Sequence, residues 1–136
     1  MSENEKKYNA VMLIDDNEID NLINQKMIEA SDISKYIYTH TGARSAIEFL
    51  KNIEKIENVG EKILPDVIFL DIDMPLMDGF QFLDEFAKLS EHTRKKCGIV
   101  MLTSSINPQD MHKSKKYDVK HYINKPLSQE NLKKLN

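Results

Sequence analysis

The feature that most constrains the fold of this chain is the alternation of two kinds of apolar pattern. Short apolar runs, several of them β-branched, have the length and composition of strands buried on both faces. They lie at Ala10–Ile14, Tyr36–His40 (the weakest), Val67–Leu70, Gly98–Leu102 and Val119–Asn124. Helical patterns follow them, through Ile19–Ala30, Ala46–Ile56 and Leu83–Leu89, then from Pro108 and, with Ser128 as the cap, near the C-terminus. This order predicts an α/β fold with a parallel sheet, covered on both faces and joined by right-handed crossovers.

The composition fits one folded domain and excludes several classes of protein. The chain has 136 residues, 19 of them basic and 22 acidic, and its single cysteine excludes a disulfide framework. The net charge of −3 disfavours a nucleic-acid binder that relies on charge alone. Apolar runs such as Ala10–Ile14 fall far short of the ~18–20 residues that cross a bilayer, and Met1–Asn9 lacks the apolar stretch of a signal peptide. We therefore expect a cytoplasmic protein without membrane insertion or direct nucleic-acid binding.

Charged and hydroxyl side chains stand directly after the predicted strands. These are Asp15 and Asp16, then Asp71 and Asp73, then Thr103, and finally Lys125. Because functional groups in parallel sheets lie beyond the carboxyl ends of the strands, we expect these side chains to converge. Two carboxylates ~4–5 Å apart repel by roughly 3–4 kcal/mol at an effective dielectric constant of about 20, so the cluster needs a cation. Carboxylate oxygens with room for water are the ligands that Mg²⁺ prefers, and Lys125 supplies further positive charge.

This set of groups predicts phosphoryl transfer to a carboxylate. A metal ion would neutralise phosphoryl oxygens, while Lys125 and Thr103 hold the others. Asp71 is the expected nucleophile because it ends the most apolar strand and would be held rigidly. The product would be an aspartyl phosphate.

The motifs resemble the receiver domain of two-component response regulators, and they occur in the order and at the spacing of that family. The resemblance rests on Asp15-Asp16, the segment from Val67 to Pro75 with Met77-Asp78-Gly79, Thr103, and Lys125-Pro126. It covers the chain from about Asn9, so we divide the protein into a flexible N-terminal segment, residues 1–8, and a receiver domain, residues 9–136. It implies a flavodoxin-like, doubly wound (βα)5 sheet with strand order 2-1-3-4-5.

The resemblance also implies a metal site and a phosphodonor. Asp71 would accept the phosphoryl group from a sensor histidine kinase or a histidine phosphotransfer protein. Asp15, Asp16 and Asp71 would bind Mg²⁺, for which Mn²⁺ is a plausible substitute. The backbone carbonyl of Asp73 would complete the protein ligands.

Further residues acquire roles from the same resemblance. Thr103, Lys125 and the backbone amide of Ser104 would bind the phosphoryl group. Thr103 and Tyr122 would form a switch that passes the signal to a downstream protein. Loop geometry would depend on Pro75, Gly79 and Pro126, the last following a cis peptide bond.

Tyr122 and a cluster of lysines each have a structural as well as a functional interpretation. Tyr122 alone is more typical of a half-buried core aromatic, although its spacing to Lys125 favours the switch. A cluster of lysines is most simply a solvated face, and a docking surface for an acidic partner is the alternative. It comprises Lys113, Lys115, Lys116 and Lys120.

Two other functions compete with a phosphorylated receiver. The Asp71-Ile72-Asp73 sequence also resembles the Asp-x-Asp motif of haloacid-dehalogenase-type phosphatases, but that family places its acidic metal pair last, whereas Asp15-Asp16 come first here. A receiver-like interaction module that is never phosphorylated usually lacks an acidic or lysine member of the site, and this chain keeps each one. We therefore expect a stand-alone phosphoacceptor signalling protein, with no enzyme activity beyond self-catalysed phosphorylation and dephosphorylation.

Overall fold

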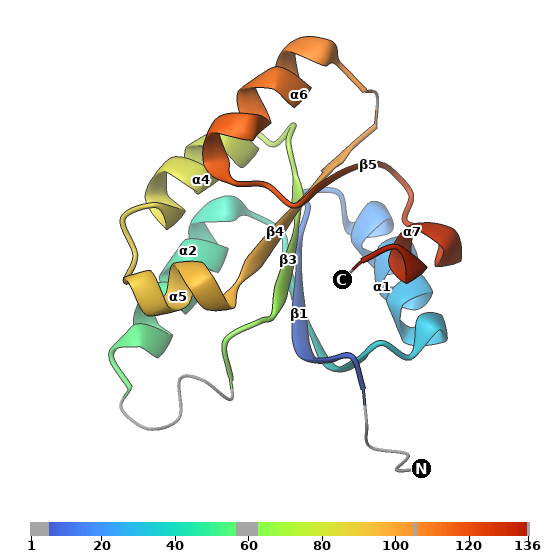
Figure 1. Cartoon of the computed structure of the whole chain (residues 1–136), viewed down its shortest axis with the longest axis horizontal. Coiled ribbons are helices and arrows are strands. Elements are labelled where there is room, and N and C mark those ends of the chain that lie inside the picture. The colour runs from blue at the N-terminus through green and yellow to red at the C-terminus, as the bar shows by residue number, and fades with distance from the viewer. Residues whose placement is uncertain (1–5, 57–62, 105, 136) are drawn as a thin grey trace.

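The fold is a five-stranded sheet in which every neighbouring pair of strands is parallel, with the order β2-β1-β3-β4-β5. The computed structural model describes residues 6–56, 63–104 and 106–135. The strands are β1 (Tyr8–Ile14), β2 (Ser34–His40), β3 (Val67–Asp71), β4 (Gly98–Thr103) and β5 (His121–Asn124). The predicted fold class and strand order are therefore confirmed (Figure 1).

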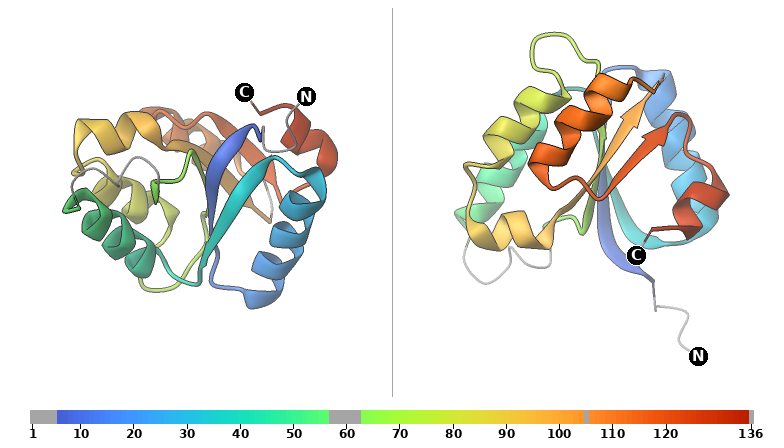
Figure 2. Two further views of the ribbon diagram at one scale, coloured as in Figure 1. Left: turned by 90° about the horizontal axis from the view of Figure 1, so that it is seen from below. Right: turned by 45° about the horizontal axis from the view of Figure 1, so that its top comes forward.

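Helices cover both faces of the sheet (Figure 2). One face carries α1 (Glu18–Ser31) and α7 (Gln129–Lys133). The opposite face carries α2 (Ala43–Glu54), α4 (Gly79–Phe86), α5 (Glu91–Lys96), and α6 (Pro108–Ser114) with the 3₁₀ turn η1 (Lys115–Tyr117). The strands thus lie between two helical layers, as their continuous apolar sequences require.

Each helical layer encloses its own core. Val11 and Leu13 of β1 point into the core beneath α1 and α7, whereas Met12 and Ile14 point into the larger core beneath α2 and α4. All four side chains are at most 1% exposed. Because successive strand residues face opposite sides, a strand buried on both sides shows no polar alternation, and this explains the apolar run at Ala10–Ile14.

Helix caps agree with several sequence predictions. The sequence offers Asp16 and Asn17 as caps of the first helix, and Asn17 is the cap of α1, where it accepts hydrogen bonds from the backbone N–H groups of Ile19 and Asp20. Pro108 is the first residue of α6, as predicted, and Ser128 caps α7. The side chains of Asn17 and Ser128 satisfy backbone N–H groups that a helix start would leave without partners.

The prediction of one continuous helix through Leu89 is wrong. The structure ends α4 at Phe86 and begins a separate helix, α5, at Glu91. The side chain of Ser90 causes the new start because it accepts a hydrogen bond from the Thr93 backbone and caps α5. The apolar spacing through Leu89 concealed this interruption.

Strand boundaries also differ from the predictions. The second strand begins at Ser34, two residues before Tyr36, and the fifth begins at His121, two residues after Val119. Asp118, with φ of 60°, turns the chain just before β5, which delays the start of that strand.

The described structure overlaps the end of the predicted N-terminal segment, residues 1–8. β1 begins at Tyr8, whose N–H donates to the Ile33 carbonyl, and residues 1–5 of the predicted segment lie outside the described residues. Asn58-Val59-Gly60, a sequence that predicts the end of the second helix, also lies outside them. Within the three described ranges, every helix is too short or too polar to cross a membrane.

Candidate functional site

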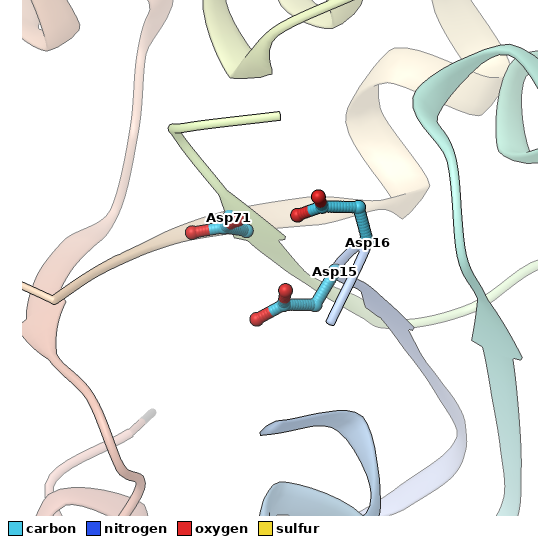
Figure 3. A group of neighbouring side chains, drawn as sticks. All are labelled: Asp15, Asp16 and Asp71. Carbon is cyan, nitrogen blue, oxygen red and sulfur yellow. The ribbon is translucent and has the colours of Figure 1, made fainter. Parts of the chain in front are cut away.

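Three carboxylates meet at the carboxyl edge of the sheet, as the sequence predicted. Asp71 is the last residue of β3, and Asp15 and Asp16 directly follow β1, the neighbouring strand. One oxygen from each of the three lies within 4.8 Å of the others (Figure 3). Asp15 and Asp71 are 1% and 2% exposed, whereas Asp16 is exposed. The arrangement therefore combines two buried acids with one that faces solvent.

Lys125, which follows β5, reaches the same group of acids. Its Nζ lies 2.9 Å from Asp15 Oδ2 and 3.3 Å from Asp71 Oδ1. The carboxylate nearest to the ammonium is that of Asp20, whose Oδ2 lies 2.8 Å from Lys125 Nζ. The Lys125-Pro126 peptide bond is cis, as the resemblance implied.

Asp20 was not among the residues that the sequence predicted for this site. Acidic residues are common in the first turn of a helix, where they offset the positive end of the helix dipole, so Asp20 had an ordinary structural explanation. The one available signal was its place in the first turn of the helix that follows Asp15-Asp16.

The charges of the site shift its pKa values strongly. Burial, followed by the charge of Asp15, raises the pKa of Asp71 to about 7, and Lys125 only partly opposes this. Burial disfavours the charged form of Lys125, but hydrogen bonds to Asp20 and Asp15 outweigh that effect and raise its pKa. One ammonium therefore leaves the negative charge of these acids incompletely balanced.

The donor set fits a hard divalent cation. Carboxylate oxygens are the ligands that Mg²⁺ and Mn²⁺ prefer, and three are close enough here to share one ion. The exposed position of Asp16 leaves room for the water ligands that Mg²⁺ retains. A cation at this place would also offset the repulsion that raises the pKa of Asp71.

The loop after β3 depends on a close approach at Gly79. A Cβ atom at this position would lie 2.8 Å from the Asp71 carbonyl oxygen and 3.0 Å from Ile72 Cα. The Gly79 N–H donates to the Ile72 carbonyl at 2.9 Å, and Asp78 caps the helix that begins there. Any side chain would push α4 away from the end of β3. Pro75, also predicted to shape this loop, accepts a hydrogen bond from the backbone N–H two residues later.

Thr103 and Ser104 lie on the opposite side of Asp71 from Asp15. Thr103 is the buried last residue of β4, the strand next to β3, and Ser104 is exposed just beyond it. The Thr103 carbonyl accepts a hydrogen bond of 2.7 Å from the Lys125 N–H. The two predicted phosphoryl-binding side chains are therefore joined through their backbones.

Tyr122 lies in β5 opposite Met101, two residues before Asn124, which pairs with Thr103. The half-buried ring packs against the core beneath α2 and α4, and the hydroxyl atom itself is buried. Burial, then the charge of Asp110, raises the pKa of Tyr122, while the Thr103 side chain is close enough to lower it. This position serves a core aromatic and a switch equally, so the switch stays a prediction.

The polar face of α1 is a second feature that sequence analysis missed. Asn21 is buried and donates from its side-chain amide to the backbone carbonyls of Asp15, at 2.8 Å, and His40, at 3.2 Å. Asn24, one turn later, accepts a hydrogen bond of 2.9 Å from the Leu127 backbone N–H. Both amides hold backbone next to the acidic cluster.

The lysine cluster does not converge on the acidic site. Lys113 lies over the Phe80 ring at 4.5 Å, and its neighbours Lys115, Lys116 and Lys120 are exposed. The structure thus separates these cations from the cation of the site, Lys125.

Comparisons with known proteins agree with this geometry. Residues 11–135 match the family described as response regulator receiver domain. The chain is 32% identical over 96% of its length to the sensor histidine kinase CheAY of Helicobacter pylori, but it spans only 15% of that protein. It is 26% identical to the response regulator Rcp1 of Synechocystis, covering 99% of this chain and 88% of Rcp1.

Solved structures give the same result. A two-component response regulator from Cytophaga hutchinsonii has a TM-score of 0.83 and 29% identity, with 94% of this chain and 93% of that chain covered. The phosphorylated cyanobacterial phytochrome response regulator RcpA has a TM-score of 0.72 and 25% identity, with coverage of 92% and 86%. Both similarities extend over nearly the whole chain.

Proposed function

The chain belongs to the response regulator receiver domain family, and on that premise we propose that it accepts a phosphoryl group on Asp71. It is thus a receiver domain of two-component signalling, and such domains are signalling proteins that take phosphoryl groups from histidine kinases. The observation that carries the proposal is the placement of buried Asp71 among Asp15, Asp16 and Lys125.

The proposed transfer needs an ionised Asp71 and a phosphohistidine donor. One Asp71 oxygen attacks the phosphorus atom, so that a P–O bond forms while the P–N bond to histidine breaks. The burial of Asp71 holds this oxygen in one position, which favours an in-line approach.

The neighbouring side chains supply the charge that the transfer requires. Asp15, Asp16 and Asp71, with the Asp73 backbone carbonyl, would hold Mg²⁺ or Mn²⁺, which supplies neutralisation of phosphoryl oxygens when bound. Lys125 lies close enough to Asp71 to contact a phosphoryl oxygen there. The Thr103 hydroxyl and the Ser104 amide donate to the remaining oxygens.

The signal would leave the site through the end of β4. Phosphorylation adds roughly −1.5 to −2 of charge, which attracts Lys125 and the Thr103 hydroxyl. Because Thr103 and Lys125 share a backbone hydrogen bond, and Tyr122 lies beside Thr103, a shift at β4 changes the packing around that ring. The two arrangements differ in their affinity for the phosphoryl group, and this difference supplies the energy of the switch.

The phosphodonor would approach past α1. Exposed apolar side chains beside a reactive group are typical of contact surfaces. Leu22 and Ile23 are 53% and 43% exposed on α1, and Ile23 lines a small cavity together with Lys125. This surface supports a protein donor, a histidine kinase or a phosphotransfer protein.

Intact-mass measurement tests the proposal directly. The wild-type chain and Asp71→Asn are incubated with a small-molecule phosphodonor, with and without Mg²⁺. We expect a single labile adduct in the wild type that needs Mg²⁺, and none in Asp71→Asn. Circular dichroism checks that Asp71→Asn is folded like the wild type. An adduct of equal yield in Asp71→Asn would contradict the assignment of the phosphoacceptor.

Two other outcomes point to the competing functions. A folded wild-type protein without any adduct would favour an interaction module that is not phosphorylated. Steady release of phosphate without an adduct would favour a phosphatase.

A further inference from the structure

The ammonium group of Lys125 is shared among three carboxylates, and the proposed phosphoacceptor holds it least closely. Hydrogen bonds of 2.8 Å and 2.9 Å connect Lys125 Nζ to Asp20 and Asp15. The distance to Asp71 is 3.3 Å. In this arrangement the side chain that must meet the phosphoryl group is drawn toward α1.

We propose that Asp20 is a positioning residue that competes with phosphorylated Asp71 for Lys125. By retaining the lysine, Asp20 slows formation of the aspartyl phosphate and shortens its lifetime. This inference rests on the proposed function, because it concerns the same phosphoryl group.

Exposure decides which carboxylate can release the lysine. The Asp20 side chain is 36% exposed, whereas that of Asp15 is 2% exposed. A carboxylate that loses its partner in a buried place stays uncompensated, but one that reaches water is hydrated at small cost. Asp20 is therefore the contact that breaks when Lys125 turns toward a phosphoryl oxygen.

Space for this movement exists beside the lysine. A cavity of about 220 Å³ is lined by Asp20, Ser104, Lys125 and their neighbours. Both partners of the Asp20–Lys125 pair border the cavity, so there is open space next to each side chain. Ser104, predicted to donate its amide to the phosphoryl group, faces the same space.

Charge adds to the competition. Asp15, Asp16 and Asp71 already place three carboxylates within 4.8 Å of one another. Asp20 brings a further negative charge to the only lysine that contacts this group among the described residues. An incoming phosphoryl group therefore meets an ammonium whose charge Asp20 has partly neutralised.

The rates of phosphorylation and dephosphorylation test the proposal. Asp20→Asn keeps the shape of the side chain and removes its charge. With a small-molecule phosphodonor and Mg²⁺, we expect this variant to form the adduct about five- to tenfold faster and to lose it more slowly, because one charged hydrogen bond no longer competes for the lysine. Asp20→Glu, which restores a carboxylate, is expected to return toward the wild-type rates.

Two further variants separate positioning from a general effect of charge. Glu18→Gln removes an exposed carboxylate from the same helical turn, and Glu18 does not contact Lys125 in the described structure, so we expect wild-type rates. In a Lys125→Ala background, Asp20→Asn should change neither rate, since the competition needs the lysine. An equal acceleration in that background would overturn the proposal.

A second measurement follows the lysine without any phosphoryl group. In metal-free protein, the ¹⁵N-coupled ammonium signal of Lys125 should be visible in the wild type and Glu18→Gln. It should be lost or broadened in Asp20→Asn, because the most exposed of its contacts, the one to Asp20, has weakened. A Lys125 signal that Asp20→Asn leaves unchanged would contradict the positioning role.

The outcomes distinguish this inference from the proposed function. If the wild-type chain forms an adduct and Asp20→Asn forms it no faster, the inference alone is wrong. A slower Asp20→Asn variant would overturn it in favour of a carboxylate that prepares Lys125 for the transfer. A wild-type chain without an adduct overturns the proposed function, and the inference with it.

Discussion

The two longest helices, α1 and α2, pack against opposite faces of the sheet and use their inward faces differently. The inward face of α2 is apolar and consists of Ala43, Ala46, Ile47, Leu50 and Ile53. The buried residues of α1 are Asn21, Asn24 and Ile28, while Ile19 and Leu22 are 67% and 53% exposed. The first helix thus reverses part of the usual amphipathic pattern.

The difference corresponds to what each helix supports. α2 contributes to the larger core and lies against β2 and α4. α1 lies next to the acidic site, where strand ends and loops leave backbone groups in need of partners, and its two buried asparagines supply them. One helix therefore stabilises the fold through burial of apolar area, and the other holds the geometry of the site.

The largest expected effect is a loss of stability when the apolar face of α2 is truncated. Leu50→Ala removes a fully buried side chain of α2 and leaves a cavity, so the free energy of unfolding should fall by about 2–5 kcal/mol. Urea denaturation measures this loss. Ile19→Ala is the matched control, because its side chain is largely exposed on α1 and its removal should cost under about 0.5 kcal/mol. Equal losses in both variants would show that α1 packs its apolar face after all.

A second prediction concerns the pH dependence of stability that the buried Asp71 causes. Burial and the neighbouring acids raise the pKa of Asp71 to about 7, above its value of ~3.9 in an unfolded chain. The folded state therefore binds the Asp71 proton more tightly than the unfolded state does. The contribution of this proton to the free energy of unfolding is fully present below about pH 4. That contribution is lost as the pH rises through about 7.

Denaturation without metal at about pH 5 and pH 8 checks the sign. We expect the wild type to lose about 2 kcal/mol more than Asp71→Asn over this range, after allowance for the partial solvent screening of the site. Added Mg²⁺ at the higher pH should stabilise the wild type more than Asp71→Asn. A pH dependence that is identical in both proteins would exclude Asp71 as its source.

The smallest of the three effects is expected when a buried asparagine of α1 is replaced. Asn24→Ala leaves the Leu127 backbone N–H without its partner in a buried place, which should cost about 1–2 kcal/mol. It should also slow phosphorylation, because this contact holds the segment directly after Lys125-Pro126. Gln25→Ala, on the next position of the same helix, is expected to change neither quantity. Unfolding curves and adduct rates for both variants would show whether α1 supports the site.

The pattern of apolar residues was sufficient to predict the sheet, but it did not predict the break between α4 and α5. Apolar runs and helical spacing report burial, and burial on both faces is what a central parallel strand requires. Leu83, Phe86 and Leu89 satisfy one helical spacing although the helix ends after Phe86. The Ser90 side chain, which caps α5, was the overlooked signal.

The predicted acids and Lys125 were found together for a topological reason. In a parallel sheet, the residues that directly follow the strands lie at the same edge, so the order of the chain alone brings Asp15, Asp71, Thr103 and Lys125 together. Side chains on α1 lack such a rule, because their direction depends on how the helix is rotated against the sheet.

The sequence pattern by itself thus determined the parallel α/β sheet, its acidic edge and the lysine that serves it, whereas the strand order followed from the resemblance to the family. Only the tertiary structure decided that Asp20 shares that lysine, and that Asn21 and Asn24 turn inward. The reason is physical: strand ends are placed by topology, whereas the contacts of a helical side chain depend on how the helix packs against other segments. Those segments can be distant in the sequence, as for Asp20 and Lys125 with a separation of 105 residues.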